Sequence, residues 1–130
     1  VMNDGMEYVE NLEDLLKRDD ALSLHVPLTE KTRGLIAERE LAWMKNGAYV
    51  VNYARGGIVS EKALYESLRS GHIAGAALDV FEVEPPDAEN NLLFKLDNVI
   101  LSPHSGTFTN DSKRRMSMRL AVEIEKVLEA

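Results

Sequence analysis

The chain has 130 residues, which suits one domain and is long enough to bury a hydrophobic core. Its formal net charge is −7, so it has no electrostatic reason to bind nucleic acid or an anionic membrane, and we expect neither as a partner. The absence of cysteine excludes disulfides, thiolate nucleophiles and cysteine-ligated zinc; we expect no metal site and a cytoplasmic location.

Short apolar runs alternate with amphipathic stretches along the chain. In chain order, the pattern predicts a helix at 12–18, a strand at 21–26, a helix at 38–45, a strand at 48–53, a helix at 61–69, strands at 74–81 and 98–102, and a last helix at about 111–128. The strand runs are continuously apolar, which is typical of parallel strands covered on both faces. This alternation predicts an α/β fold with a mostly parallel sheet and right-handed crossovers.

Polar side chains follow the predicted strands. Arg55 follows the second strand in the turn Ala54-Arg55-Gly56-Gly57, and His104 follows the fourth strand. Ligands of parallel sheets bind at the carboxyl ends of the strands, so these positions are candidates for a site. The planar guanidinium of Arg55 matches a carboxylate or phosphate, although an arginine that pairs with an acid at a strand end is the competing interpretation.

The loop after the third strand carries Glu84. A histidine such as His104 exchanges protons near neutral pH, and a carboxylate beside it stabilises the imidazolium and fixes its tautomer. Alone, either residue would be read as structural, as we read His25 and His72. Together with Arg55 they indicate a reaction in which the arginine binds a small acid and the histidine handles a hydroxyl proton. No side chain accepts a hydride, so this chemistry requires a nicotinamide cofactor.

Four segments resemble the NAD-dependent D-isomer-specific 2-hydroxyacid dehydrogenases, a family that includes phosphoglycerate, glycerate/hydroxypyruvate and D-lactate dehydrogenases. The segments are LHVPLTEKTRGLI (24–36), VNYARGGIVSEKAL (51–64), GHIAGAALDVFEVEP (71–85) and NVILSPHSG (98–106). They follow one another in the family's order and cover most of the chain. The resemblance implies a Rossmann-like, doubly wound parallel sheet and an oxidoreductase that transfers a hydride between NAD(H) and a small D-2-hydroxy acid or 2-keto acid.

The resemblance also implies roles for individual residues. The family's catalytic residues fall on Arg55, which binds the substrate carboxylate, on His104, the acid/base, and on Glu84, which tunes His104. The implied cofactor-binding residues are Pro27, Tyr53, Ala54, Arg55, Asp79, His104 and Gly106. Homodimerisation is implied too. The branch of formate dehydrogenases differs, because it has glutamine where this chain has Glu84.

Two departures from the family bear on function. The segment after His104 reads Ser-Gly-Thr rather than a run such as Ile-Gly-Gly, which leaves the substrate open. No G-x-G-x-x-G loop occurs, and the acid expected about 20 residues after it is also missing, so NAD and NADP are not distinguished. We therefore expect residues 1–130 to be the C-terminal part of an NAD-binding Rossmann domain without its first β-α-β unit, with the helix at 111–128 returning towards a separate substrate domain.

Three functions fit this interpretation. The first is a dehydrogenase whose isolated 130-residue chain is inactive and binds NAD weakly. The second is a non-enzymatic NAD(H)-sensing scaffold like the co-repressor relatives of the family, which keep the same three residues. The third is an inactive fragment. A half sheet would also expose apolar surface, so we expect the isolated chain to associate or to be unstable.

Overall fold

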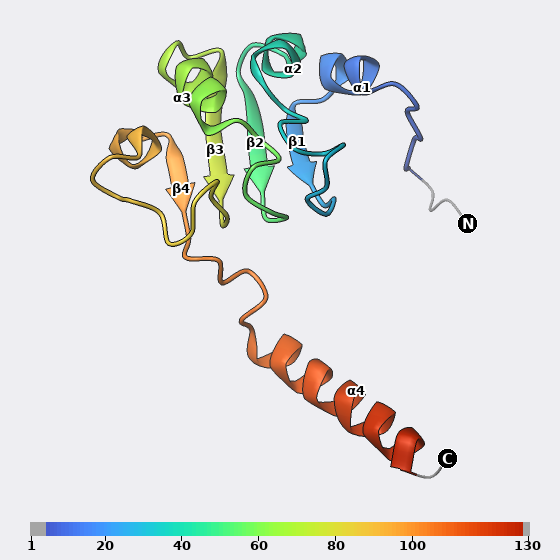
Figure 1. The fold of residues 1–130 in the computed structure, drawn as a ribbon. Coiled ribbons are helices and arrows are strands. Elements are labelled where there is room, and N and C mark those ends of the chain that lie inside the picture. Colours follow the sequence, from blue (N-terminus) through green and yellow to red (C-terminus); the bar gives the residue numbers. More distant parts are fainter. Residues whose placement is uncertain (1–4, 129–130) are drawn as a thin grey trace.

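The computed structural model describes residues 5–128 and is built on a four-stranded parallel sheet (Figure 1). The strands lie in the order β1-β2-β3-β4, which is also their order in the sequence. Their bounds are β1 Ala21–Leu24, β2 Ala48–Asn52, β3 Ile73–Leu78 and β4 Val99–Leu101. The predicted α/β fold with a parallel, Rossmann-like sheet is therefore confirmed.

The helices form at the predicted places. They are α1 Leu12–Arg18, α2 Glu38–Trp43, α3 Glu61–Arg69 and α4 Asn110–Leu128. Side chains cap three of them. Asn11 accepts a hydrogen bond from the Glu13 amide, Ser60 one from the Ala63 amide and Thr109 one from the Ser112 amide. A short 3-10 helix, η1 (Leu92–Lys95), was not predicted because one turn is too short to show a periodic pattern.

The strands end earlier than their apolar runs do. The run at 74–81 continues past Leu78, and Val80 and Phe81 are buried although they lie outside β3. The run at 21–26 likewise continues past Leu24 into exposed residues. A side chain can be buried even where its main chain does not pair with a neighbouring strand. An apolar run therefore shows which residues enter the core better than it shows where a strand ends.

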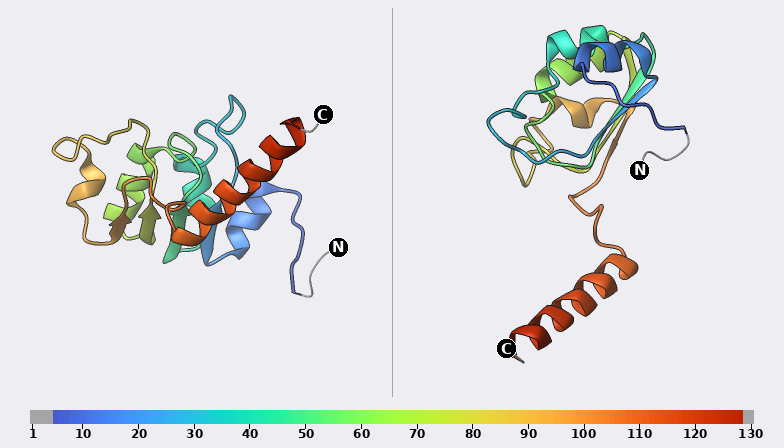
Figure 2. Two further views of the ribbon diagram at one scale, coloured as in Figure 1. Left: turned by 90° about the horizontal axis from the view of Figure 1, so that it is seen from below. Right: turned by 90° about the vertical axis from the view of Figure 1, so that its right-hand side faces the viewer.

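The three short helices lie on one face of the sheet. α1 packs on α2 and α2 packs on α3, and the three gather together in Figure 2. Sequential strand order with right-handed crossovers puts successive connections on the same side, which explains this layer. Leu16, Val50, Leu64 and Ile73 contribute to the buried core between helices and sheet.

No part of residues 5–128 covers the other face of the sheet. Tyr49 on β2 is 54% exposed and Ile100 on β4 is 70% exposed. The expectation that both faces are covered is thus wrong for the described residues, because no helix among them crosses to this side. The continuously apolar strands still carry the composition of a sheet that is buried on both faces.

Helix α4 projects away from the sheet (Figures 1 and 2). It carries an apolar stripe that is exposed along its whole length, and this stripe comprises Met116, Leu120, Ile124, Val127 and Leu128. The expected exposure of apolar surface is present both here and on the open sheet face. No helix among residues 5–128 combines the length and apolar character needed to cross a membrane.

The turn after β2 touches the loop after β3 through Gly56. A Cβ atom at Gly56 would lie 1.6 Å from the carbonyl oxygen of Phe81 and 3.0 Å from the amide nitrogen of Glu82. These neighbours are main-chain atoms, which cannot rotate away as a side chain can. The two segments can therefore approach this closely only because residue 56 has no side chain.

We predict that Gly56→Ala destabilises the protein by about 3 kcal/mol or more, since overpacking against main chain forces the two segments apart. The measurement is the urea midpoint of the complete gene product. Gly71→Asn is the control, because Gly71 has a φ of +78° with open space around it and asparagine tolerates that conformation. Equal losses in the two variants would contradict the steric explanation.

Candidate active site

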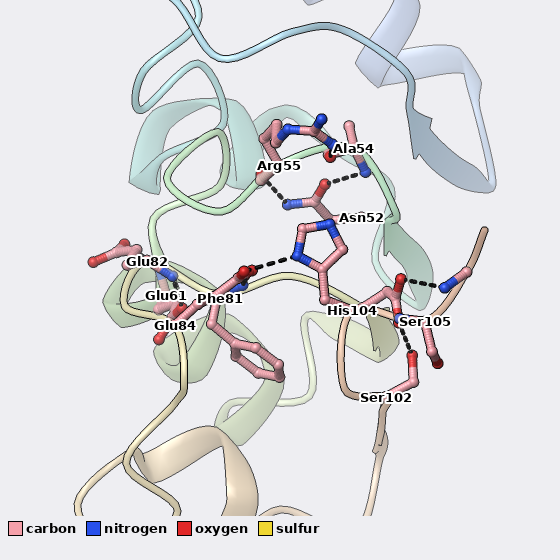
Figure 3. A network of polar contacts seen from close by, with 12 residues as sticks. Asn52, Ala54, Arg55, Glu61, Phe81, Glu82, Glu84, Ser102, His104 and Ser105 are labelled. Atoms are coloured by element: carbon pink, nitrogen blue, oxygen red, sulfur yellow. Dashed lines mark hydrogen bonds and ion pairs between the residues drawn. The ribbon is translucent and has the colours of Figure 1, made fainter. Parts of the chain in front are cut away.

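A buried amide organises the turn that carries Arg55. Asn52 is the last residue of β2, and its Nδ2 donates to the carbonyl oxygen of Arg55 at 3.0 Å while its Oδ1 accepts from the Ala54 amide at 3.1 Å (Figure 3). The side chain of Arg55 is held at one atom, since Nη1 donates to the Ala54 carbonyl at 2.7 Å. The residue itself is exposed, so a carboxylate can reach the guanidinium from solvent.

His104 and Glu84 are joined by a hydrogen bond between their side chains. His104 Nδ1 lies 2.7 Å from Glu84 Oε2, and Glu84 Oε1 accepts from the Phe81 amide at 3.1 Å. The hydrogen bond with His104 is the main cause that lowers the pKa of Glu84, aided by the Phe81 amide and by the charge of Arg55, while partial burial opposes them. Glu84 therefore stays a carboxylate near neutral pH.

This pairing fixes which nitrogen of His104 can react. An ionised carboxylate only accepts hydrogen bonds, so Nδ1 carries a proton that it donates to Glu84. The other ring nitrogen, Nε2, is turned away from Glu84 towards the side on which Arg55 lies (Figure 3). The side chain of His104 is 46% exposed, so Nε2 is open to a small molecule. The arrangement can move one proton at Nε2.

Asp79 holds the loop on which His104 lies. This residue is 2% exposed, and its carboxylate accepts from Ser102 Oγ at 2.5 Å, from the Ser105 amide at 2.8 Å and from the Gly106 amide at 2.7 Å. Burial alone would raise the pKa of Asp79, but these hydrogen bonds and the nearby His104 together lower it.

His104 itself adopts a strained backbone conformation with φ +52°, which is unusual for a residue other than glycine. Its two following amides, at Ser105 and Gly106, are the ones that Asp79 binds. Such strain persists where the surroundings hold it, and it is frequent at functional sites. Asp79 therefore acts here as an anchor that keeps His104 in place.

A cavity of about 300 Å³ lies at the carboxyl ends of β1 and β2. It is lined by His25, Val26, Pro27, Tyr53, Ala54 and Arg55. Tyr53 connects it to the loop of His104, because a Cβ atom at Gly106 would lie 2.7 Å from the Tyr53 ring and 2.9 Å from Asp79 Oδ2. The loop thus packs closely against the edge of the cavity.

The structure brings the residues expected from the sequence into two adjoining groups. Pro27, Tyr53, Ala54 and Arg55 line the cavity, and the second group comprises Asp79, Glu84, His104 and Gly106. The Tyr53–Gly106 contact joins the groups. Arg55 contributes charge to the second group without a hydrogen bond to Glu84 or His104.

Two supporting residues were not anticipated from the sequence. Asn52 fixes the Arg55 turn, and Ser102 binds Asp79. Both are polar residues at the carboxyl end of an apolar run. A polar residue at that position is a usable signal, because a buried amide or hydroxyl must find a hydrogen-bond partner.

We predict that Asp79→Asn destabilises the protein by about 2 kcal/mol at pH 7, since an amide cannot accept all three hydrogen bonds and leaves buried donors unpaired. A lowered folded pKa stabilises above the unfolded value of about 3.9 and this stabilisation is lost as the pH falls through the folded value. The urea midpoints of wild type and variant should therefore converge on acidification. Asp97→Asn, at an exposed acid, is the control, and a constant gap would contradict the assignment.

Comparison with known proteins matches residues 1–106 to the NAD binding domain of the D-isomer specific 2-hydroxyacid dehydrogenases. The chain is 50% identical over 124 residues to a D-3-phosphoglycerate dehydrogenase of Methanocaldococcus jannaschii and 49% identical over 124 residues to a hydroxypyruvate reductase of Thermotoga maritima. Each match covers 95% of this chain, but only 23% and 40% of these relatives, respectively. The chain therefore spans a minor part of their length.

Solved structures agree with the sequence matches. A putative D-isomer specific 2-hydroxyacid dehydrogenase from Polaromonas superimposes with a TM-score of 0.87 at 32% identity, covering 96% of this chain and 39% of that one. A D-lactate dehydrogenase from Aquifex aeolicus, complexed with NAD and lactic acid, gives 0.79 at 33% identity over 91% of this chain and 40% of that one. A family member from Xanthobacter autotrophicus, complexed with NADPH and MES, gives 0.69 at 46% identity over 72% and 30%.

The family match covers far more than half of the chain, and the parallel sheet and its connections agree with it. The chain therefore belongs to the D-isomer specific 2-hydroxyacid dehydrogenase family, and residues 1–106 are part of the NAD-binding domain of that family.

Proposed function

We propose that this chain carries the reacting groups of a dehydrogenase that interconverts a small D-2-hydroxy acid and its 2-keto acid with a nicotinamide cofactor. The observation that carries the proposal is the His104–Glu84 pair, 2.7 Å apart, at the same sheet edge as the exposed Arg55. The family membership supports it, as do relatives named for reactions of 2-hydroxy or 2-keto acids.

Each residue has a distinct role in this reaction. Arg55 binds the carboxylate of the acid through its guanidinium fork. In the reductive direction, Nε2 of His104 would give its proton to the keto oxygen as the keto carbon takes up the hydride. In oxidation, neutral Nε2 accepts the hydroxyl proton. Glu84 stabilises the protonated imidazole and keeps Nδ1 occupied, so Nε2 is always the atom that exchanges the proton.

The cavity at the ends of β1 and β2 fits the nicotinamide end of such a cofactor. Its lining combines flat apolar surfaces at Pro27 and Tyr53 with main-chain polar groups around Ala54, which suit an aromatic ring bearing an amide. When bound, the cofactor supplies or accepts the hydride. Asp79 and Gly106 would contribute from the adjoining loop. Family members have been solved with NAD and with NADPH, so we propose NAD or NADP as the cofactor.

Under this proposal, binding of the cofactor's pyrophosphate and selection of the substrate belong to other parts of the protein. The described residues hold no glycine-rich loop for the pyrophosphate, and we propose that residues 1–130 are the C-terminal part of the NAD-binding domain. We further propose that α4 leads towards a separate substrate domain, which would select among 2-keto acids. Activity towards different 2-keto acids therefore has to be tested on the complete gene product.

We predict that the complete gene product oxidises NADH or NADPH with one or more of glyoxylate, hydroxypyruvate, phosphohydroxypyruvate and pyruvate. His104→Ala should lower kcat by roughly 10²- to 10⁴-fold, which is the usual contribution of a general acid, while the variant still binds the cofactor. The measurement combines absorbance assays at 340 nm with titration of the cofactor by fluorescence.

The control variant is His72→Gln, because His72 contacts the Leu41 carbonyl far from the site and should leave turnover intact. Cofactor binding without turnover on any acid would contradict the proposal and would favour the NAD(H)-sensing scaffold. Turnover that survives in His104→Ala would instead remove His104 from the reaction.

We predict that Glu84→Gln narrows the pH range of the reduction. Loss of the carboxylate removes the charge that lies beside the His104 ring, so the alkaline limb of the kcat profile should move to lower pH. The measurement is kcat against pH for reduction of the best substrate. Glu89→Gln, at an exposed acid on the same loop, is the control; an unmoved limb in Glu84→Gln would contradict the role of Glu84.

A further inference from the structure

Two glutamates outside the catalytic trio bind each other's main chain. The carboxylate of Glu82 accepts a hydrogen bond from the Glu61 amide at 2.9 Å, and the carboxylate of Glu61 accepts one from the Glu82 amide at 2.6 Å. Glu61 is the first residue of α3, and Glu82 lies two residues before Glu84 (Figure 3). This reciprocal pair, which we call the Glu61–Glu82 clamp, joins the start of α3 to the loop that carries Glu84.

The same glutamate also holds the far end of that loop. Glu61 Oε2 accepts from Asn91 Nδ2 at 2.7 Å, and Asn91 in turn caps η1 through the Leu93 amide at 3.0 Å. One carboxylate thus ties both ends of the segment 82–91 to a single point on α3. Loops of this length are mobile unless hydrogen bonds tie them down.

The clamp contacts the turn that carries Arg55. Arg55 and Gly56 precede α3, and Gly56 packs against Phe81 and the Glu82 amide, the same group that Glu61 binds. Glu84 then reaches back to the Phe81 amide and across to His104. A chain of contacts, through Gly56, the clamp and Glu84, therefore connects Arg55 with His104.

Capping of α3 accounts for only half of the clamp. Glu82 binds the Glu61 amide, an N–H of the first helical turn, whereas the bond from the Glu82 amide to the Glu61 carboxylate ties the loop after β3 to the helix. Ser60 already caps this helix through the Ala63 amide. A carboxylate that accepts from main-chain N–H groups makes a stronger hydrogen bond than a neutral side chain does, so both bonds of the clamp are firm. Here each carboxylate is directed at a main-chain donor of the other segment, which fixes the separation of the two segments.

We propose that Glu61 is a positioning residue for the reaction, which holds Glu84, and through it His104, in register with Arg55. The inference rests on the proposed function and extends it to residues that contact neither substrate nor cofactor. Because Asn52 holds the Arg55 turn independently, loss of the clamp should displace Glu84 and leave the carboxylate-binding arginine in place.

The test compares Glu61→Ala, Glu61→Gln and Glu82→Gln in the complete gene product. Glu61→Ala removes the two bonds that the Glu61 carboxylate accepts, from the Glu82 amide and from Asn91, and keeps the bond from its own amide to Glu82. It should lower kcat by roughly 10- to 100-fold, as expected for a small misplacement of a reacting group, with KM for the keto acid within about twofold. Its alkaline limb should move in the same direction as that of Glu84→Gln. Glu82→Gln keeps an oxygen that accepts from the Glu61 amide and should be close to wild type, with Glu61→Gln in between.

Glu66→Ala is the matched control, since Glu66 lies on the same helix and makes only a 4.0 Å ion pair with Arg69. Wild-type kcat and pH profile in Glu61→Ala would overturn the proposal. So would a parallel change of kcat and KM together with a lowered melting temperature, because that would indicate a merely structural role.

Hydrogen exchange separates this inference from the proposed function. Peptides that cover residues 81–84 should lose protection in Glu61→Ala and keep it in Glu66→Ala. If the wild type showed no turnover, the proposed function would fail, and the exchange result would still decide whether Glu61 holds the Glu84 segment. Unchanged exchange in Glu61→Ala would overturn the clamp itself.

Discussion

The close approach of Gly56 to the carbonyl of Phe81 is the constraint on which the site depends. It brings the turn after β2 against the loop after β3, two segments that the sheet alone would leave only as neighbours. Arg55 lies on one side of this contact and Glu84 on the other. Any side chain at residue 56 would separate the charge that binds an acid from the pair that moves a proton.

Two carboxylates at this edge, those of Asp79 and Glu84, each accept hydrogen bonds from several donors. Asp79 accepts from one hydroxyl and two amides, and Glu84 accepts from one amide and from His104. Both pKa values are lowered as a result. The two acids therefore stay ionised with different effects, since Asp79 fixes the backbone around His104 and Glu84 fixes its ring.

The strand order explains why one face of the sheet is open. Consecutive parallel strands laid in one direction place their connections on a single face, so the chain uses its helices on one side. The other face keeps Tyr49 and Ile100 exposed, and α4 exposes its apolar stripe. Large exposed apolar surfaces of this kind normally mark places where another part of a protein, or a partner, binds. The chain spans 40% or less of the first two curated relatives that it matches.

Local sequence patterns determined the strands, the helices and the placement of Arg55, Glu84 and His104 after strand ends, because apolar periodicity and capping residues act within a few positions. They could not determine where the ladders stop, which sheet face is covered, or that one turn of 3-10 helix precedes β4. Only the tertiary structure decided that Asp79 anchors the His104 loop and that Glu61 and Glu82 bind each other's main chain. These contacts join residues more than 20 positions apart, so they depend on how the strands align in space and leave no periodic trace in the sequence.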